Sequence, residues 1–420
     1  MSAPDVVALS GQLAVLFAFA ALAHFVFRRL RQPVLLGEIA IGVLLGPSLL
    51  GTLTSYTFDA TFIGPLAAVG SIFLLFRIGL ESDFRAVYTR GNLLVALGGV
   101  LLPFAAGFAA AYLALPPEGL GPSGTQFTVS MFVGTTLVAT SVAIAAAILH
   151  EVGLVRDVVA RTILGAAIVD DILGLLVLSI SVGVAGSGVS VVNITIQVIV
   201  AVAFIGLATY IGSRYFSRLV TWAHAKGLKY GLTHTGFMVA MALAFFTAFL
   251  AEAIGLSAVV GAFLAGAMVS SNALREDFHE GVAFLGAIFT PVFFISLGLL
   301  VDIWTLTASL LLFGAVLLAV AFVTKLAGCG LAARWTGMSR EASLAVGYGM
   351  VPRGEVGLII ALVAVQFAVI GADLFSIIVL VMVVVSVLPA PLLRKYLLEM
   401  QRREAKAAGP ERARPEQGPF

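Results

Sequence analysis

The chain has 420 residues, of which 60% are hydrophobic and 11% are charged, and its mean hydropathy is +1.10. A water-soluble fold of this length cannot bury that much apolar surface, so the composition indicates a polytopic membrane protein. The net charge of +2 is uninformative in total, and the one cysteine, Cys329, excludes a disulfide framework and a cysteine-rich metal site. The first apolar run is long enough to span a membrane and its basic residues follow it, which is not the pattern of a cleaved signal.

A spanning helix needs about 20 apolar residues, and the sequence predicts thirteen transmembrane helices. Their apolar runs are continuous rather than alternating, which excludes a closed barrel. In chain order the predicted segments are 5–27, 34–51, 61–82, 91–115, 126–150, 157–184, 190–213, 232–254, 256–271, 281–301, 305–333, 340–368 and 372–394.

The placement of basic residues predicts the orientation of these segments. With the N-terminus outside, every long inward loop carries Lys or Arg. By the positive-inside rule the C-terminus is then cytoplasmic, in a multi-pass protein of the cell (inner) membrane. The charged, Pro- and Ala-rich residues 397–420 predict a disordered cytoplasmic tail. The outward loops without Lys or Arg lie near 52–60, 116–125, 185–190, 302–304 and 369–372.

A short motif recurs at an offset of 219 residues. Gly79-Leu80-x-x-Asp83 reappears as Gly298-Leu299-x-x-Asp302, and Gly42 maps onto Gly261. This offset pairs helices 1–6 with helices 8–13, and the two halves enter the membrane from opposite sides. Inverted repeats of this kind are typical of secondary transporters, with the ion site near the midplane.

Two adjacent carboxylates, Asp170 and Asp171, lie near the middle of an apolar segment. One ionised side chain at the bilayer centre costs about 2.5–3.5 kcal/mol, so the pair needs water, a partner or a cation. Because close carboxylates resist simultaneous ionisation, the pair predicts a site that holds protons and a hard cation in turn. The alternative is that both acids form structural ion pairs.

Lys325 lies within segment 305–333 and is the obvious counter-ion for one of these acids. A buried ammonium needs such a partner or loses its proton. In the alternative interpretation its long stem extends toward the cytoplasmic end of the helix.

Two segments contain features that interrupt a helix at mid-depth. A proline within Gly349–Glu355 predicts a break whose half-helix ends lie beside Arg353 and Glu355, which suits ion coordination. The alternative is a kink in which Arg353 and Glu355 pair with each other. Thr140 and Ser141 lie at a similar depth without a proline, so the residues alone favour hydroxyls that bond back to their own helix over a second break.

Arg77 lies less than two turns from the cytoplasmic end of its segment, where we expect it to extend to the membrane surface and pair with Glu81. No hydrolytic, nucleotide-binding or redox motif is present: there is no GxxxxGK[ST], and the five histidines are scattered. The sequence therefore predicts a protein that is not an enzyme, has no cofactor and no nucleic-acid partner, and is driven by an ion gradient.

Taken together, these residues resemble the monovalent cation:proton antiporter superfamily, in particular the NapA type of sodium/proton antiporter, which is related to NhaA and to Kef-type proteins. Arg77 departs from the apolar residue expected at its position. The resemblance extends from about residue 10 to 396 and rests on Gln32-Pro33 through Gly46-Pro47, Gly79-Leu80-Glu81, Ala139-Thr140-Ser141, Ile168-Val169-Asp170-Asp171, Gly261–Gly266 and Pro352–Leu358.

The resemblance implies roles for single residues. Asp171 would be the main ion and proton carrier, and Asp170 would form an ion pair with Lys325 that breaks when sodium binds. The unwound part of helix 5 would lie at Thr140-Ser141, which would bind sodium together with both aspartates. Arg353 and Glu355 would flank the break in helix 12.

The resemblance also implies an all-α membrane fold of two inverted six-helix repeats with broken crossing helices. A transmembrane antiporter domain would cover residues 1–396. Its mobile core would comprise about 91–184 and 305–394, and helices 1–3 and 8–10, joined by helix 7, would form the dimerisation part of a homodimer.

We therefore expect a secondary active antiporter that exchanges cytoplasmic Na⁺ or Li⁺ for external H⁺ by alternating access, electrogenically. The alternatives are a potassium/proton antiporter, a cation channel, and a sodium-coupled symporter of organic solutes.

Overall fold

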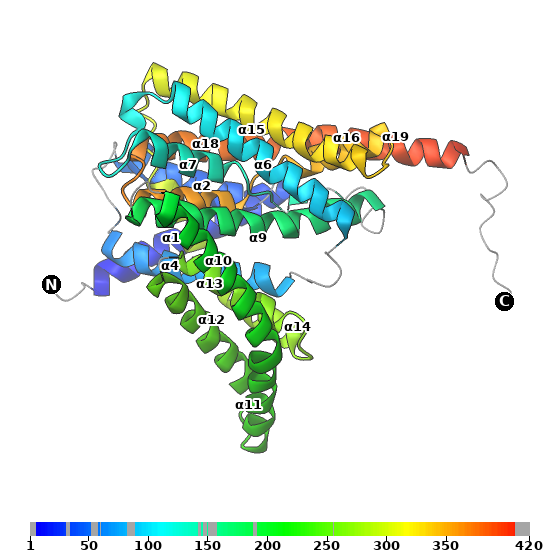
Figure 1. Cartoon of the computed structure of the whole chain (residues 1–420). Helices are drawn as coiled ribbons and strands as arrows, with labels where there is room; N and C mark the ends of the chain where they lie inside the picture. The colour runs from blue at the N-terminus through cyan, green and yellow to red at the C-terminus, as the bar shows by residue number, and fades with distance from the viewer. Residues whose placement is uncertain are drawn as a thin grey trace.

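The computed structural model describes residues 6–30, 34–51, 58, 60–81, 89–141, 144–145, 149, 158–187, 191–254 and 256–407. Within these ranges the regular elements are helices, and one isolated backbone bridge joins Leu120 to Ile370. The helices, labelled as in Figure 1, are α1 (Val6–Arg29), α2 (Val34–Leu45), η1 (Pro47–Gly51), α4 (Ala60–Glu81), α6 (Arg90–Ala114), η2 (Pro117–Gly119), α7 (Gln126–Thr136), α9 (Val158–Ser187), α10 (Val191–Ile211), η3 (Gly212–Phe216), α11 (Ser217–Lys229), α12 (Thr235–Ala253), α13 (Ala258–Val269), α14 (Arg275–Leu299), α15 (Ala308–Trp335), α16 (Arg340–Met350), α17 (Glu355–Gln366), α18 (Ala372–Val387) and α19 (Pro389–Ala407).

Eight helices in the described part of the chain are long and apolar enough to cross a membrane: α1, α4, α6, α9, α12, α14, α15 and the run from α18 into α19. Shorter apolar helices lie in α2 with η1, α10, α13 and α17. Many large apolar side chains are exposed, such as Leu101 and Leu113 on α6 and Leu312 on α15. In water these would be a liability, whereas in a bilayer they face lipid.

The helices pack as two groups. In the α6 group, α6 lies against α7, α9 and α15, and α15 also packs on α16 and α18 (Figure 1). Helix α19 packs on α16 and α18, and α17 packs on α7 and α18. In the α4 group, α4 packs on α13 and α14, with α1, α2, α11 and α12 around them. Helix α10 contacts both α9 and α13 and so links the two groups. A shared apolar core, with Leu178 and Phe263 among its members, lies between them.

The structure differs from the sequence predictions at two places outside the membrane. Residues 217–229, predicted as part of a loop, form helix α11, because Val220, Ala223 and Gly227 recur at helical spacing and are buried on one side. The predicted disordered tail 397–420 is wrong for residues 397–407, where α19 continues. Leu393 and Leu397 are buried, and Tyr396 stacks on Tyr348 with ring centroids 5.3 Å apart. Residues 408–420 lie outside the described part.

Glycines bring several pairs of helices into backbone contact. A Cβ atom on Gly98 of α6 would lie 2.3 Å from the carbonyl oxygen of Gly328 on α15, and one on Gly328 would lie 2.2 Å from the oxygen of Gly98. Gly42 of α2 and Gly298 of α14 exclude side chains from each other in the same way, with a Cβ on either placed 2.7 Å from the other's Cα. These contacts fix which helices lie side by side in each group.

We predict that Gly98→Val destabilises the fold by about 1–3 kcal/mol, since the added side chain must push α6 away from α15. Thermal unfolding in detergent measures this. Gly206→Ala on α10 is the matched control, because a Cβ there has nothing within 4 Å. Equal stability of the two variants would contradict the close approach of α6 and α15.

Candidate functional site

Asp170 and Asp171 lie near the middle of α9, a helix of 30 residues. Asp170 is 0% exposed and Asp171 is 3% exposed, so neither faces lipid. One turn after Asp170, Gly174 packs against Cγ1 of Val138, at 3.5 Å from an added Cβ, which places this part of α9 beside the chain that follows α7. The predicted pair of buried mid-helix acids is therefore confirmed in position.

Lys325 of α15 reaches the first of these acids. Its Nζ donates to both carboxylate oxygens of Asp170 at 2.8 Å, to the Gly99 carbonyl at 2.8 Å and to the Val138 carbonyl at 2.5 Å. Both side chains of the ion pair are fully buried. The alternative in which Lys325 extends to the cytoplasmic end of its helix is wrong, because Gly99 has no side chain to exclude the ammonium and three carbonyl or carboxylate groups bind it.

The predicted break in the 340–368 segment is confirmed. Helix α16 ends at Met350, residues 351–354 are not helical, and α17 begins at Glu355. Pro352 lacks an amide hydrogen and disfavours helix in the residue before it, which accounts for the interruption. Gly354 then adopts extended backbone, and a Cβ on it would lie 2.7 Å from Cβ of Ser141. The break is thus pressed against a second segment.

That second segment is the chain after α7, which ends at Thr136, followed by non-helical residues through Ser141. The Ser141 hydroxyl accepts from the Ile144 amide at 3.4 Å, within its own part of the chain. The interpretation that the Thr140 hydroxyl bonds back to its own helix is wrong. Hydroxyls that do so lie one turn earlier: Thr135 donates to the Met131 carbonyl and Thr136 to the Val133 carbonyl, both at 2.7 Å. These bonds occupy the last turn of α7 and precede the unwound segment 137–141.

The two unwound segments cross and bond to each other. The amide of Ser141 donates to the Pro352 carbonyl at 2.8 Å, and the Thr140 hydroxyl donates to the Met350 carbonyl at 3.1 Å. Unwound backbone inside a membrane is tolerated only where protein groups satisfy it, and each segment here satisfies part of the other.

Arg353 completes the crossing. Its Nη1 donates to the Val138 and Ala139 carbonyls at 3.0 and 2.9 Å, and its Nη2 donates to Ala321 of α15 at 3.1 Å. The alternative of a kink held by an Arg353–Glu355 pair finds no support, because the guanidinium is bonded to main-chain carbonyls; the side chain of Glu355 lies outside the described part. Helix α17 therefore starts next to a residue that is anchored to the segment after α7 and to α15.

The site combines four buried ionisable groups, Asp170, Asp171, Lys325 and Arg353. With all four ionised, the two negative and two positive charges cancel. No cluster of three His, Cys, Asp or Glu side chains suited to a transition metal occurs among the described residues. The oxygens present, from carboxylates, hydroxyls and carbonyls, are those that hard cations prefer.

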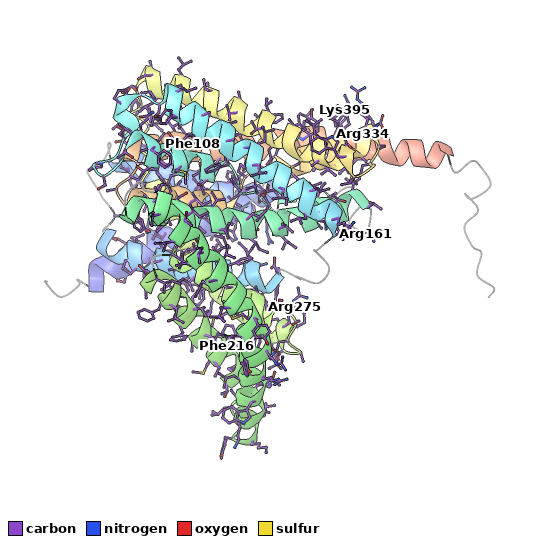
Figure 2. The ribbon with its side chains drawn as sticks, viewed as in Figure 1. Phe108, Arg161, Phe216, Arg275, Arg334 and Lys395 are labelled. Carbon is purple, nitrogen blue, oxygen red and sulfur yellow. The ribbon has the colours of Figure 1, made fainter. Side chains whose placement is uncertain are left out.

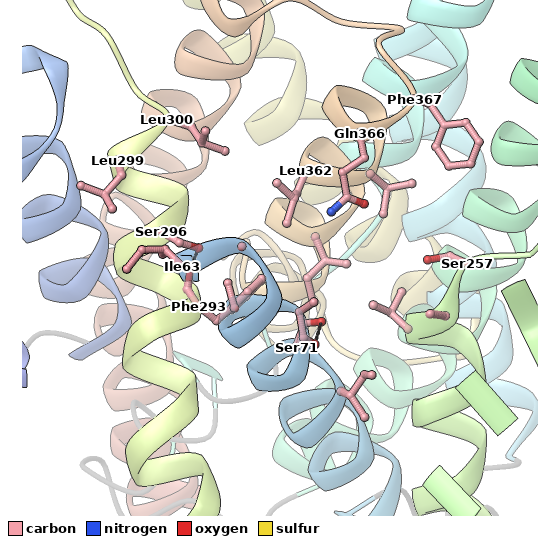
Figure 3. A pocket seen from close by; sticks show the side chains of 18 of the residues that line it. Ile63, Ser71, Ser257, Phe293, Ser296, Leu299, Leu300, Leu362, Gln366 and Phe367 are labelled. Carbon is pink, nitrogen blue, oxygen red and sulfur yellow. Dashed lines mark hydrogen bonds between the residues drawn. The ribbon is translucent and has the colours of Figure 1, made fainter. Parts of the chain in front are cut away.

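A cavity of about 490 Å³ lies between the two helix groups (Figure 3). Ile63 and Ser71 of α4 and Phe293 of α14 line one side, and Leu362 and Gln366 of α17 line the other. The aspartates do not line it. The cavity thus separates the group that carries the buried charges from the other group, at the end of α17 remote from the break.

Arg77 forms the predicted pair at the membrane surface. Its Nε donates to the Glu81 carboxylate at 3.0 Å, and both side chains are about half exposed. His279 of α14 bonds the same carboxylate at 3.1 Å. The unusual arginine therefore belongs to a surface network of α4 and α14, separate from the buried charges.

Several residues of the site carry no polar side chain and escaped the sequence prediction. Gly99 admits the Lys325 ammonium, and the Val138 carbonyl accepts from two cations. Ser386 of α18 was also missed; its hydroxyl donates to the Arg353 carbonyl at 2.5 Å. The Gly98-Gly99 pair inside an apolar helix was the one available signal, because adjacent glycines there point to a close approach.

Comparison with known proteins gives the same class from independent evidence. Residues 14–397 match the family described as "Sodium/hydrogen exchanger, transmembrane". The chain is 30% identical over 407 residues to the Na⁺/H⁺-K⁺ antiporter GerN of Bacillus cereus, covering 94% of this chain and 98% of that protein. It is 33% identical over 393 residues to a Na⁺/H⁺ antiporter of Enterococcus hirae, covering 92% and 97%.

The fold is also similar to a solved structure. The sodium proton antiporter MjNhaP1 from Methanocaldococcus jannaschii superposes with a TM-score of 0.66 over 94% of this chain and 98% of that one, at 16% sequence identity. Apolar helices around crossing unwound segments and buried charges define an integral multi-pass membrane protein built to move ions. The chain belongs to the sodium/hydrogen exchanger family.

We predict that Lys325→Met destabilises the protein by about 3–5 kcal/mol, because it leaves Asp170 buried without its counter-ion. Combining it with Asp170→Asn should restore most of the loss. Thermal unfolding of the wild type, the two single variants and the double variant gives the coupling energy. Additive single losses would mean that the contact does not stabilise the fold.

Proposed function

We propose that this protein is a secondary active antiporter that exchanges Na⁺ for H⁺. The observation that carries the proposal is that two buried aspartates lie beside two crossing unwound segments. One of these aspartates, Asp170, forms an ion pair with Lys325. Protons and a hard cation compete for such oxygens. The relatives in Bacillus cereus and Enterococcus hirae are named for this exchange.

In the proposed cycle, Asp171 is the main carrier and binds either a proton or Na⁺. Asp170, Thr140 and Ser141 supply further oxygen ligands to the cation. When Na⁺ occupies the site, it takes over Asp170 from Lys325, and the lysine gives up its proton. No cofactor takes part, and Li⁺ is expected to replace Na⁺ because it suits the same oxygens.

Alternating access follows from the cost of an uncompensated charge in an apolar surrounding. We infer that the α6 group carries the site past the α4 group only when a proton or cation balances the acids. The cavity between Ser71 of α4 and Gln366 of α17 would then be a vestibule for ions on one side of the membrane (Figure 3).

We further propose thirteen spans in two inverted repeats. Under the offset of 219 residues, α2 corresponds to α13 and α4 to α14, so the α2–α14 contact at Gly42 and Gly298 corresponds to the α13–α4 contact. In that second contact a Cβ on Gly266 would lie 1.9 Å from the Phe76 carbonyl oxygen. Gly70 packs on Phe289, the residue that the same offset assigns to it.

The orientation has the N-terminus outside and the C-terminus in the cytoplasm, in the cell membrane. Arg161, Arg275, Arg334 and Lys395 lie toward the end of the bundle from which α19 emerges (Figure 2), as the positive-inside rule expects of a cytoplasmic side. We propose a homodimer formed through the α4 group, which would leave the α6 group free to move.

The first test is proton flux in proteoliposomes that contain Na⁺, Li⁺ or K⁺. We expect Na⁺- and Li⁺-driven flux in the wild type and at least about a hundredfold loss in Asp171→Asn, since a neutral amide neither takes up nor releases a proton near neutral pH and offers the cation no negative charge. Glu276→Gln, an exposed acid in the first turn of α14, is the matched control and should keep full activity.

Full exchange in a folded Asp171→Asn would mean that another group is the carrier. Flux driven by K⁺ instead of Na⁺ would indicate a potassium/proton antiporter, and flux driven by both would indicate an antiporter that accepts either ion; the Bacillus cereus relative is named a Na⁺/H⁺-K⁺ antiporter. Flux without stoichiometric proton movement would indicate a channel.

The second test concerns stoichiometry. If Asp171 and Lys325 each release one proton when Na⁺ binds, two protons exchange for each Na⁺ and the exchange moves net charge. The membrane potential at which flux reverses in proteoliposomes, measured at fixed Na⁺ and pH gradients, should match that ratio. A reversal potential that fits one proton per Na⁺ would contradict the role given to Lys325.

A further inference from the structure

Arg353 is the largest fully buried side chain in the described part of the chain, at 1% exposed. A buried guanidinium ordinarily faces a carboxylate, yet the hydrogen bonds of its two terminal nitrogens go to three main-chain carbonyls on two other segments. The guanidinium is a planar fork whose donors have fixed directions. The position of the guanidinium is therefore set by backbone geometry in the segment after α7 and on α15.

Two of these carbonyls belong to Val138 and Ala139, which follow the end of α7 at Thr136 in a non-helical segment and so have no helical hydrogen-bond partner. Away from water, an unsatisfied carbonyl is costly. Lys325 also bonds the Val138 carbonyl, whereas the Ala139 carbonyl is bonded by Arg353. Arg353 is thus a main restraint on the first residues of the unwound segment 137–141.

Arg353 is itself held in place from the other side. Its own carbonyl accepts a hydrogen bond from the Ser386 hydroxyl of α18, and its Nη2 is bonded to Ala321, one turn before Lys325 on α15. A single residue, Arg353, thereby links the unwound segment 137–141 to α15 and α18. The unwound segment 137–141 cannot move relative to Lys325 without breaking these hydrogen bonds.

The restrained residues of the unwound segment 137–141 are followed directly by Thr140 and Ser141, two of the proposed cation ligands. We propose that Arg353 is a positioning residue for ion selectivity. Its guanidinium holds the unwound segment 137–141 so that these oxygens fit a small alkali cation and cannot move apart to fit a larger one. Discrimination between ions of equal charge depends on the number, placement and mobility of the ligand oxygens. This inference rests on the proposed sodium/proton exchange.

A different role for Arg353 is that of a fixed positive charge that offsets the aspartates. The two roles separate in Arg353→Lys, which keeps the charge but replaces the fork by one ammonium that cannot reach three carbonyls in the same directions. A role through charge alone predicts near-normal selectivity in this variant. A role through positioning predicts altered selectivity with the charge intact.

The experiment measures proton flux in proteoliposomes against Na⁺, Li⁺ and K⁺ concentration for the wild type and Arg353→Lys. We expect the KM for Na⁺ to rise about tenfold and the Na⁺-over-K⁺ preference in kcat/KM to fall about tenfold, the effect of losing one charge-assisted hydrogen bond. The pH profile, which reports the carriers themselves, should keep its shape.

The matched control is Arg334→Lys on α15. Its Nη1 also donates to a main-chain carbonyl, that of Met338, at 2.5 Å, but at an exposed position near the helix end. This variant should keep the wild-type KM values and preference. It tests whether any arginine-to-lysine change on a carbonyl alters transport.

An unchanged Na⁺-over-K⁺ preference in folded Arg353→Lys, or an equal loss for every ion, would overturn the inference. If this variant does not fold, Gly354→Ala decides, because the three atoms nearest to its added Cβ all belong to Ser141, which must therefore shift; an unchanged preference there also overturns the inference. Absence of Na⁺-driven flux in the wild type would instead refute the proposed function, and this inference with it.

Discussion

Main-chain groups in a membrane must find protein partners when a helix unwinds, and this requirement organises the whole site. The chain after α7 and the 351–354 break satisfy it in part by bonding to each other, through Thr140 and Ser141. Two buried basic side chains satisfy further carbonyls, since Lys325 and Arg353 both donate to Val138 and Arg353 also donates to Ala139. The same groups that repair the backbone therefore bring positive charge next to the aspartates, so structure and ion chemistry are inseparable here.

Much of this site could be predicted from the sequence because charge and proline are conspicuous in an apolar chain. Asp170, Asp171 and Lys325 stand out by their cost in hydrocarbon, and Pro352 marks a break by its missing donor. The break after α7 could not be predicted from the residues alone. Its cause is tertiary, because hydrogen bonds with α15 and with the other broken segment stabilise the unwound backbone. Thr140 and Ser141 by themselves are equally compatible with an intact helix.

The fold was predictable to a similar depth. Apolar runs located the long helices because length and hydropathy are properties of the local chain. Helix α11 and the extension of α19 were missed because their apolar residues, such as Val220 and Leu397, form narrow stripes that matter only once a neighbour covers them. Contacts made through glycines, such as that between Gly42 and Gly298, leave little trace in hydropathy and are visible only as geometry.

The contact of Gly98 with Gly328 bears on how the lysine can leave its acid. At Gly98 and Gly328 no side chain separates α6 from α15, so the two backbones are in direct contact, and the Lys325 ammonium is bonded next to that junction to the Gly99 carbonyl. Sliding one helix along the other by a single residue, about 1.5 Å, would drive carbonyls into each other. A slide of α6 along α15 is therefore blocked, so the proposed release of Lys325 from Asp170 would need a change at the two side chains themselves, by loss of the lysine's proton or by competition from a cation.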